Sequence, residues 1–133
     1  MKLNHLNLTV NDLSGARDFF ETYFNFQFIE QKGKALIVLC DSDGFILTLV
    51  NSNELKDGMG GPYPKAFHLG FLVESSNEVD EIYNRLVEGE IEYVQKPHKM
   101  RGNNYGFYFM ALNELLIEVS CLVYKNVKKI TTD

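Results

Sequence analysis

Two histidines of this sequence are the first residues whose type and spacing suggest chemistry. Residues 4–10 and 67–73 each alternate apolar and polar side chains, which is typical of a strand with two unlike faces. The apolar series of each strand should meet a helix, so strand parity places His5 and His68 on the opposite face. Because neutral imidazole is a common metal ligand, we expect this shared face to carry a site.

A glutamate in the last predicted strand belongs to the same face. Residues 115–122 contain the apolar series Leu115, Ile117, Val119 and Cys121, which leaves Glu118 on the other side. A carboxylate inside an apolar strand is costly to bury unless it pairs with a cation or accepts a hydrogen bond. Either Glu118 accepts hydrogen bonds that hold strands together, or it joins the two histidines in binding a divalent metal.

The elements that must position these residues follow one order twice. The first half predicts a strand, a helix from about residue 13 to 23 with its N-cap at Asn11 or Asp12, and strands over 26–31, 35–40 and 45–50. Asp41 to Gly44 suits a hairpin turn between the last two. The second half predicts a strand over 67–73, a helix capped within 75–77, and strands over 91–94, 105–110 and 115–122.

The two halves also match in sequence. The segment His5 to Val10 lies 63 positions before His68 to Val73 and shares its histidine, its apolar sites and its valine. Such self-similarity indicates an internal duplication. We therefore divide the chain into module 1 (1–51), a turn-rich linker (52–65), module 2 (66–123) and a polar tail (124–133).

Composition excludes several classes of protein. The 133 residues are 45% hydrophobic and 23% charged with a net charge of −5, as in an ordinary globular domain. No run of Lys or Arg before the last ten residues suggests binding to nucleic acid or to a membrane surface. The start of the chain lacks the apolar stretch of a secretory signal, and Cys40 and Cys121 fit as small core residues, so a cytoplasmic location is expected.

At this point the sequence resembles the vicinal oxygen chelate superfamily, which contains glyoxalase I, extradiol dioxygenases, fosfomycin-resistance proteins and bleomycin-binding proteins. The resemblance covers nearly the whole chain and rests on the segments HLNLTVNDL, ARDFFETYFNFQF, HLGFLV and YFMALNELLIE. It implies an α+β fold in which two tandem βαβββ modules form a curled mixed sheet around a cleft.

The resemblance also assigns roles to single residues. The positions of His5, His68 and Glu118 are metal ligands in the family, and Tyr108 matches an acid/base residue of the extradiol dioxygenases. A set of two histidines and one carboxylate with open coordination positions favours Fe(II) or Mn(II), with Zn(II), Ni(II) or Mg(II) as alternatives. The fourth ligand position of glyoxalase I falls on Thr48, or on Leu47 in the other register, and neither residue is a credible ligand.

The predicted function is a metal-dependent enzyme for a small oxygen-chelating substrate, of the dioxygenase, lyase or isomerase type. The alternative is a non-catalytic binding protein of the bleomycin-resistance type, and a fosfomycin-type transferase is a third possibility. Substrate contacts are expected from Asn7, Thr9, Thr48 and Arg101. Residues 97–104 are predicted as a loop. His98 is most simply a solvated histidine, with a substrate contact as the alternative, and Lys99 and Arg101 could meet an anionic group. We expect a homodimer, because small modules leave sheet edges that need cover.

Overall fold

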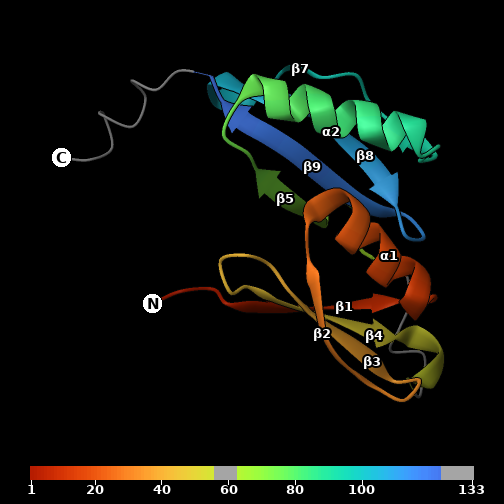
Figure 1. Ribbon diagram of the computed structural model, residues 1–133. Coiled ribbons are helices and arrows are strands. Elements are labelled where there is room, and N and C mark those ends of the chain that lie inside the picture. Colours follow the sequence, from red (N-terminus) through yellow and green to blue (C-terminus); the bar gives the residue numbers. More distant parts are fainter. Residues whose placement is uncertain (56–62, 124–133) are drawn as a thin grey trace. The chain divides into compact units, whose positions relative to one another are not determined.

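The computed structural model describes residues 1–55 and 63–123, which form two compact units divided between residues 63 and 64. Each unit contains one helix packed on one mixed sheet, and neither sheet closes into a barrel (Figure 1). The α+β fold predicted from the sequence is therefore confirmed. Part of the predicted linker and the whole predicted tail lie outside the described residues.

The elements of the first unit agree closely with the sequence pattern. They are β1 (His5–Val10), α1 (Leu13–Phe24), β2 (Gln27–Lys32), β3 (Leu36–Cys40), β4 (Ile46–Asn51) and the short helix η1 (Ser52–Glu54). The Asp12 side chain caps α1 by accepting from the Gly15 amide, and the helix ends at Asn25, whose φ of 57° is left-handed. The sheet order is β1-β4-β3-β2, with β1 parallel to β4.

The second unit repeats this order. Its elements are β5 (His68–Leu72), α2 (Ser76–Glu88), β6 (Tyr93–Val94), β7 (His98–Lys99), η2 (Arg101–Asn103), β8 (Asn104–Ala111) and β9 (Leu115–Leu122). The sheet order is β5-β9-β8-β6, with β5 parallel to β9. His5 and His68 thus each open a strand that runs parallel to the last strand of its own unit, which is the topology that the duplication predicts.

One segment of the second unit differs from the prediction. Residues 97–104 were expected to be a loop, but His98 and Lys99 pair with β8, and η2 follows them. His98 pairs with Gly106 and Lys99 pairs with Tyr105, which lie eight and six residues further along the chain. Neither His98 nor Lys99 has a strong strand preference, so the local sequence gives no sign of it.

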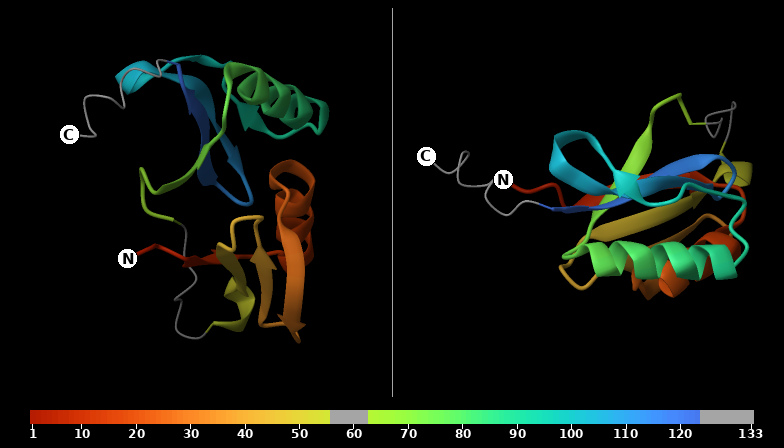
Figure 2. Two further views of the ribbon diagram at one scale, coloured as in Figure 1. Left: turned by 60° about the vertical axis from the view of Figure 1, so that its left-hand side comes forward. Right: turned by 90° about the horizontal axis from the view of Figure 1, so that it is seen from above.

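The apolar faces of both sheets are covered by the helices, as strand parity requires (Figure 2). In the first unit Leu8, Val10, Leu47 and Leu49 are buried together with the α1 residues Ala16 and Phe20. In the second unit Phe107, Phe109, Ile117 and Val119 are buried together with Val79 and Leu86 of α2. Among the described residues, no helix has the length and apolarity that a membrane span needs.

A hydrogen bond between α2 and β8 yields a pH-dependent prediction. The Tyr105 hydroxyl donates to Asp80 Oδ1 at 2.6 Å, and this bond, with burial and the Asp80 charge, raises the pKa of the phenol from 10.0 to about 12. A group whose pKa rises on folding stabilises the fold below its unfolded pKa. Tyr105→Phe should lower the free energy of unfolding by about 1 kcal/mol at pH 8, and this deficit should shrink as the pH rises from 10 through 12.

Urea denaturation at several pH values measures this effect. Tyr93→Phe is the control, since Tyr93 is exposed on β6. Equal stability of the two variants at pH 8 would show that the bond to Asp80 adds nothing.

Candidate metal and ligand site

Two of the three predicted metal ligands lie together in the second unit. His68 opens β5, and Glu118 lies in the neighbouring β9 directly opposite Gly70. His68 Nε2 and Glu118 Oε1 are 3.5 Å apart, and their side chains are 37% and 19% exposed. Strand parity therefore correctly placed the imidazole and the carboxylate on one face of this sheet.

A main-chain contact fixes the tautomer of the His68 ring. His68 Nδ1 lies 2.9 Å from the carbonyl oxygen of Ala66. A carbonyl oxygen only accepts, so Nδ1 carries the proton, and in the neutral ring Nε2 keeps the lone pair. The nitrogen that faces Glu118 is therefore the one that can bind a cation, in the arrangement that orients metal-ligating histidines in other proteins.

The distance between the two side chains fits ligands of one metal ion. Bonds of about 2.1 Å at angles of roughly 90 to 110° separate neighbouring ligand atoms by roughly 3.0 to 3.5 Å. The 3.5 Å between His68 Nε2 and Glu118 Oε1 lies at the upper end of this range. A lone pair facing a carboxylate oxygen is repulsive unless a proton or a metal ion lies between them, so the donor set fits a divalent cation.

Tyr108 completes the group. It lies in β8 directly opposite Glu118, and its ring meets the His68 ring edge to face with centroids 5.6 Å apart. Burial raises the pKa of the Tyr108 phenol, its hydrogen bond to Glu118 and the carboxylate charge raise this pKa further, and the Arg101 charge opposes them. At neutral pH Tyr108 is therefore a protonated donor beside the carboxylate.

The third predicted ligand, His5, belongs to the first unit. It is exposed at the start of β1, and its Nδ1 lies 2.7 Å from Asn4 Oδ1, so its Nε2 is also the outward-facing ring nitrogen. No group of three or more His, Cys, Asp or Glu side chains able to hold a metal is found within residues 1–55 and 63–123. The role of His5 as a ligand stays a prediction.

Three predicted substrate contacts also belong to the first unit. Asn7 lies directly opposite Thr48 of β4, and both share a face with His5 and Thr9. The adjacent Leu47 is buried, which settles the register in favour of Thr48 as the residue on that face. Thr9 also accepts a hydrogen bond from the Tyr63 hydroxyl through its carbonyl oxygen.

A pocket of about 530 Å³ opens in the second unit at Tyr108 and Glu118. The other residues that line it are His98, Lys99, Met100, Arg101 and Asn104. The fourth predicted substrate contact, Arg101, is thus in the same pocket as the metal-ligand candidate Glu118. Its volume falls within the range of roughly 300 to 1,000 Å³ that is usual for small-molecule sites.

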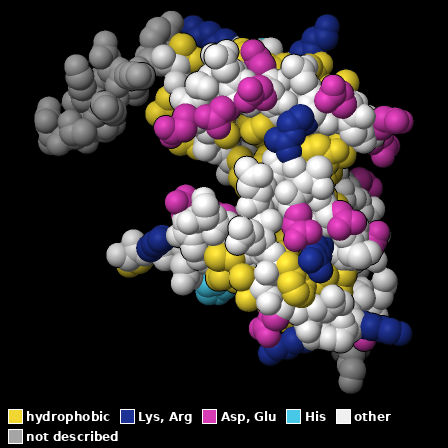
Figure 3. All heavy atoms as spheres, viewed as in Figure 1, with side chains coloured by type: hydrophobic (Ala, Val, Ile, Leu, Met, Phe, Trp, Pro, Cys, Tyr) yellow, Lys and Arg dark blue, Asp and Glu magenta, His cyan; other side chains and the backbone are white. Residues whose placement is uncertain are grey.

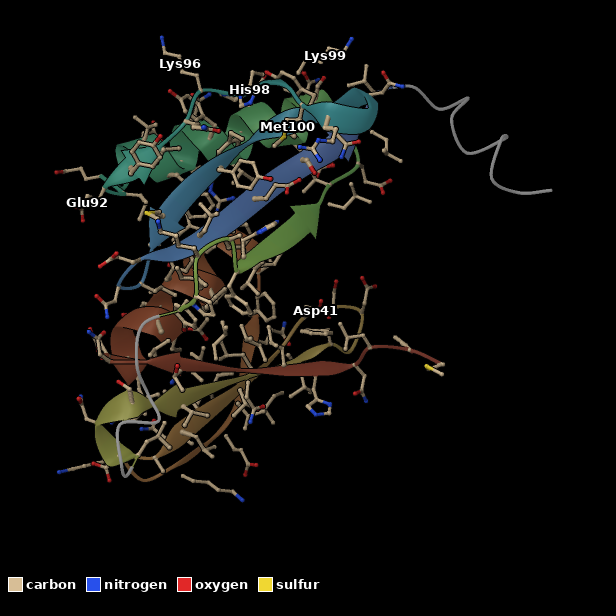
Figure 4. The ribbon with its side chains drawn as sticks, turned by 180° about the vertical axis from the view of Figure 1, so that it is seen from behind. Asp41, Glu92, Lys96, His98, Lys99 and Met100 are labelled. Carbon is tan, nitrogen blue, oxygen red and sulfur yellow. The ribbon has the colours of Figure 1, made fainter. Side chains whose placement is uncertain are left out.

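Strand pairing decides which side chains of β7 serve this pocket. His98 lies opposite Gly106, two residues before Tyr108, so its ring belongs to the face of Tyr108 and Glu118. Lys99 lies opposite Tyr105, whose hydroxyl reaches α2, so the Lys99 side chain belongs to the other face. In Figure 4 the Lys99 side chain reaches outward, away from the strands.

Sequence reasoning therefore missed His98 and Asn104 as pocket residues. His98 Nδ1 lies 2.9 Å from the Lys96 carbonyl oxygen, which leaves Nε2 available as in His68. The sequence carries no clear signal for His98, because the backbone that closely approaches the interrupting glycine of β8, Gly106, is that of Val119 and Ser120 in β9.

Comparison with known proteins places this geometry in a family. The model of the Glyoxalase/Bleomycin resistance protein/Dioxygenase superfamily matches residues 2–119. The chain belongs to this superfamily, so the resemblance predicted from the sequence is confirmed. A search of curated proteins finds no match.

Solved structures agree with this assignment. A possible glyoxalase from Bacillus cereus is 42% identical, with a TM-score of 0.76, covering 91% of this chain and 99% of its own. A lactoylglutathione lyase from Agrobacterium tumefaciens is 21% identical, with a TM-score of 0.69, covering 90% and 92%. The fosfomycin resistance protein FosX from Listeria monocytogenes is 20% identical, with a TM-score of 0.72, covering 91% and 93%. The last two share the fold with this chain.

Proposed function

We propose that this protein is a divalent-metal-dependent enzyme that acts on a small oxygen-chelating substrate, in a reaction of the dioxygenase, lyase or isomerase type. The observation that carries the proposal is the His68 Nε2 to Glu118 Oε1 distance of 3.5 Å, with His68 Nδ1 held by a main-chain carbonyl. His5 is the proposed third ligand, because it opens β1 as His68 opens β5. Fe(II) and Mn(II) are the favoured ions, since two histidines and one carboxylate suit them.

The residues around the proposed ligands have distinct tasks. A bound divalent ion supplies Lewis acidity that polarises a substrate carbonyl or hydroxyl. Tyr108 holds its proton on the phenolic oxygen beside Glu118 and can donate it to a substrate oxygen in the pocket. Asn7, Thr9 and Thr48 are proposed to contact the polar groups of the substrate.

Elemental analysis tests the metal requirement. Protein purified without chelators should carry Fe or Mn at close to one ion per chain, and a chelator should remove it. His68→Ala should lose the ion, whereas His98→Ala should keep it, because His98 lies in the pocket but outside the proposed ligand set. Wild-type protein that contains no metal and takes up none would overturn the proposal and favour the non-catalytic binding protein instead.

We further propose a homodimer that works in the cytoplasm. Every residue of the edge strand β2 is exposed, including Phe28 and Ile29, which gives an uncovered edge that a second copy could pair with. The cysteines Cys40 and Cys121 are free thiols, as suits a reducing compartment. Sedimentation velocity at micromolar concentration tests the dimer, and a 15.3 kDa species alone would exclude it.

A further inference from the structure

The pocket of the second unit is lined by charges of both signs. Glu118 lies beside Tyr108, and Arg101 belongs to η2, which follows β7. Among the described residues, Arg101 has no acidic side chain within ion-pairing distance, whereas Glu118 lies 3.5 Å from His68 Nε2. A guanidinium without a carboxylate partner at the wall of a pocket is suited to a ligand that brings its own negative charge.

The backbone holds Arg101 in a fixed turn. Gly102 and Asn103 have left-handed φ angles of 73° and 67°, which reverse the chain directly after the arginine. The Met100 amide donates to the Asn104 carbonyl oxygen at 2.7 Å, and the Val123 amide donates to the Asn103 carbonyl oxygen at 3.0 Å. Because this turn is already closed, a ligand that binds Arg101 does not have to order the segment first.

The other face of the same sheet repels anions. Helix α2 carries the acidic residues Glu78, Asp80, Glu81 and Glu88, and Figure 3 shows acidic side chains gathered along it. Lys99 lines the pocket, but its pairing with Tyr105 directs its side chain toward that face. Arg101, helped by the hydrogen-bonding groups of His98 and Asn104, is therefore the cationic contact that we assign to the pocket.

We propose that this pocket binds a small oxyanion, the carboxylate or phosphate end of the substrate, through the Arg101 guanidinium. The inference rests on the proposed function for the other end of the substrate, whose oxygens would reach the metal at Glu118. The proposed substrate is therefore an anionic molecule with neighbouring chelating oxygens. In metal-free protein the Glu118 charge opposes the anion, so removing that charge strengthens anion binding even without a metal.

Nuclear magnetic resonance titrations of metal-free, full-length protein test this inference. The probes are acetate for the carboxylate class, methylphosphonate for the phosphate class and acetamide as the neutral analogue. Glu118→Gln should bind one of the two anions about three-fold more tightly than wild type, with shifts in the amides of residues 98–104. Adding Arg101→Gln should weaken this binding about ten-fold, because it removes the charged donor. The anion that binds more tightly identifies the class.

Lys96→Gln in the same Glu118→Gln background is the matched control. It removes one positive charge near the pocket, but Lys96 does not line it, and Figure 4 shows its side chain pointing outward. Binding within two-fold of the parent variant is expected. Equal losses of anion affinity in the Arg101 and Lys96 variants, or no saturable binding of either anion, would overturn the proposal. The spectra also report whether each variant is folded.

The two proposals fail in different ways. Arg101→Gln alone should take up Mn(II) as wild type does, because Arg101 is not among the proposed ligands. Anion binding without any metal uptake would refute the metal proposal and leave the anion pocket standing. Metal uptake with no Arg101-dependent anion binding would refute the anion pocket and leave the metal proposal standing.

Discussion

Replacing Glu118 by Ala is expected to abolish the thermal stabilisation of this protein by Mn(II) or Fe(II). A ligand that binds only the folded state adds about 2.7 kcal/mol when present at a hundred times its Kd. For a chain of this length that corresponds to a rise in Tm of roughly 10 °C. Glu118 supplies the proposed ligands' only carboxylate, 3.5 Å from His68 Nε2, so its loss should remove this rise.

Without metal the same variant should differ little from wild type. Glu118 is 19% exposed and contacts His68 and Tyr108, and partly exposed pairs of this kind contribute about 1 kcal/mol or less. Thermal melts of both proteins, each with chelator and with excess metal, separate the two effects. Glu92→Ala is the control, because Glu92 is an exposed glutamate of the same unit outside the pocket, and Figure 4 shows it at the surface.

Two outcomes of these melts would count against a metal site at Glu118. One is an equal rise in Tm for wild type and Glu118→Ala on adding metal. The other is a large loss of stability in the variant that neither chelator nor metal alters, since Glu118 would then be a structural hydrogen-bond acceptor. Glu118→Gln, which keeps the shape and one acceptor, gives a second measurement if the alanine variant does not fold.

Replacing Gly106 by Ala is expected to lower the free energy of unfolding by about 3 kcal/mol or more. A Cβ at Gly106 would lie 2.1 Å from the Val119 carbonyl oxygen and 2.7 Å from Ser120 Cα. These are backbone atoms of the neighbouring strand β9, which cannot rotate away as a side chain can. The cost should therefore reach or exceed the upper end of the usual 1 to roughly 3 kcal/mol for overpacking.

Gly70→Ala provides the matched control for this substitution. Gly70 is also a strand glycine of the second unit, but a Cβ there would meet nothing within 4 Å. Its effect should stay within about 0.5 kcal/mol. Urea denaturation followed by circular dichroism compares the two variants, and similar midpoints would show that β8 and β9 can separate at no cost. Because β8 carries Tyr108 and β9 carries Glu118, the Gly106 variant should also bind metal less well.

Local sequence determined most of the secondary structure. Asp12 marked the start of α1, and the Asp-Gly step of the β3–β4 turn produced a hairpin in which Gly44 has a φ of 87°. The Asp41 carboxylate accepts from the Asp43 and Phe45 amides in this turn, so a single side chain organises it. Such features are predictable because they depend on contacts within about four residues.

Strand alternation determined half of the candidate site. The period of two places His68 and Glu118 on one face once β5 and β9 are neighbours, and the pairing of Gly70 with Glu118 makes them so. The same rule places His5, Asn7 and Thr9 on one face of β1. The metal role of the three predicted ligands is still a prediction, because alternation fixes a side chain's face and not the ion that it binds.

The pocket itself was decided only by tertiary structure. His98 becomes a pocket residue because two residues of a turn-rich segment pair with β8, and Lys99 is turned to the other face by the same pairing. The turn that holds Arg101 is closed by the Met100 amide, which donates to the Asn104 carbonyl oxygen, and by the Val123 amide, which donates to the Asn103 carbonyl oxygen 20 residues away. The sequence by itself determined that each unit begins with a strand and a helix followed by further strands, and the face of its own strand on which each of His68 and Glu118 lies, because these follow from short-range periodicity. That His98 rather than Lys99 shares a face with Tyr108 required the pairing of β7 with β8, and the presence of Arg101 and Glu118 in one pocket required tertiary packing. No local sequence pattern contains the energy of either arrangement.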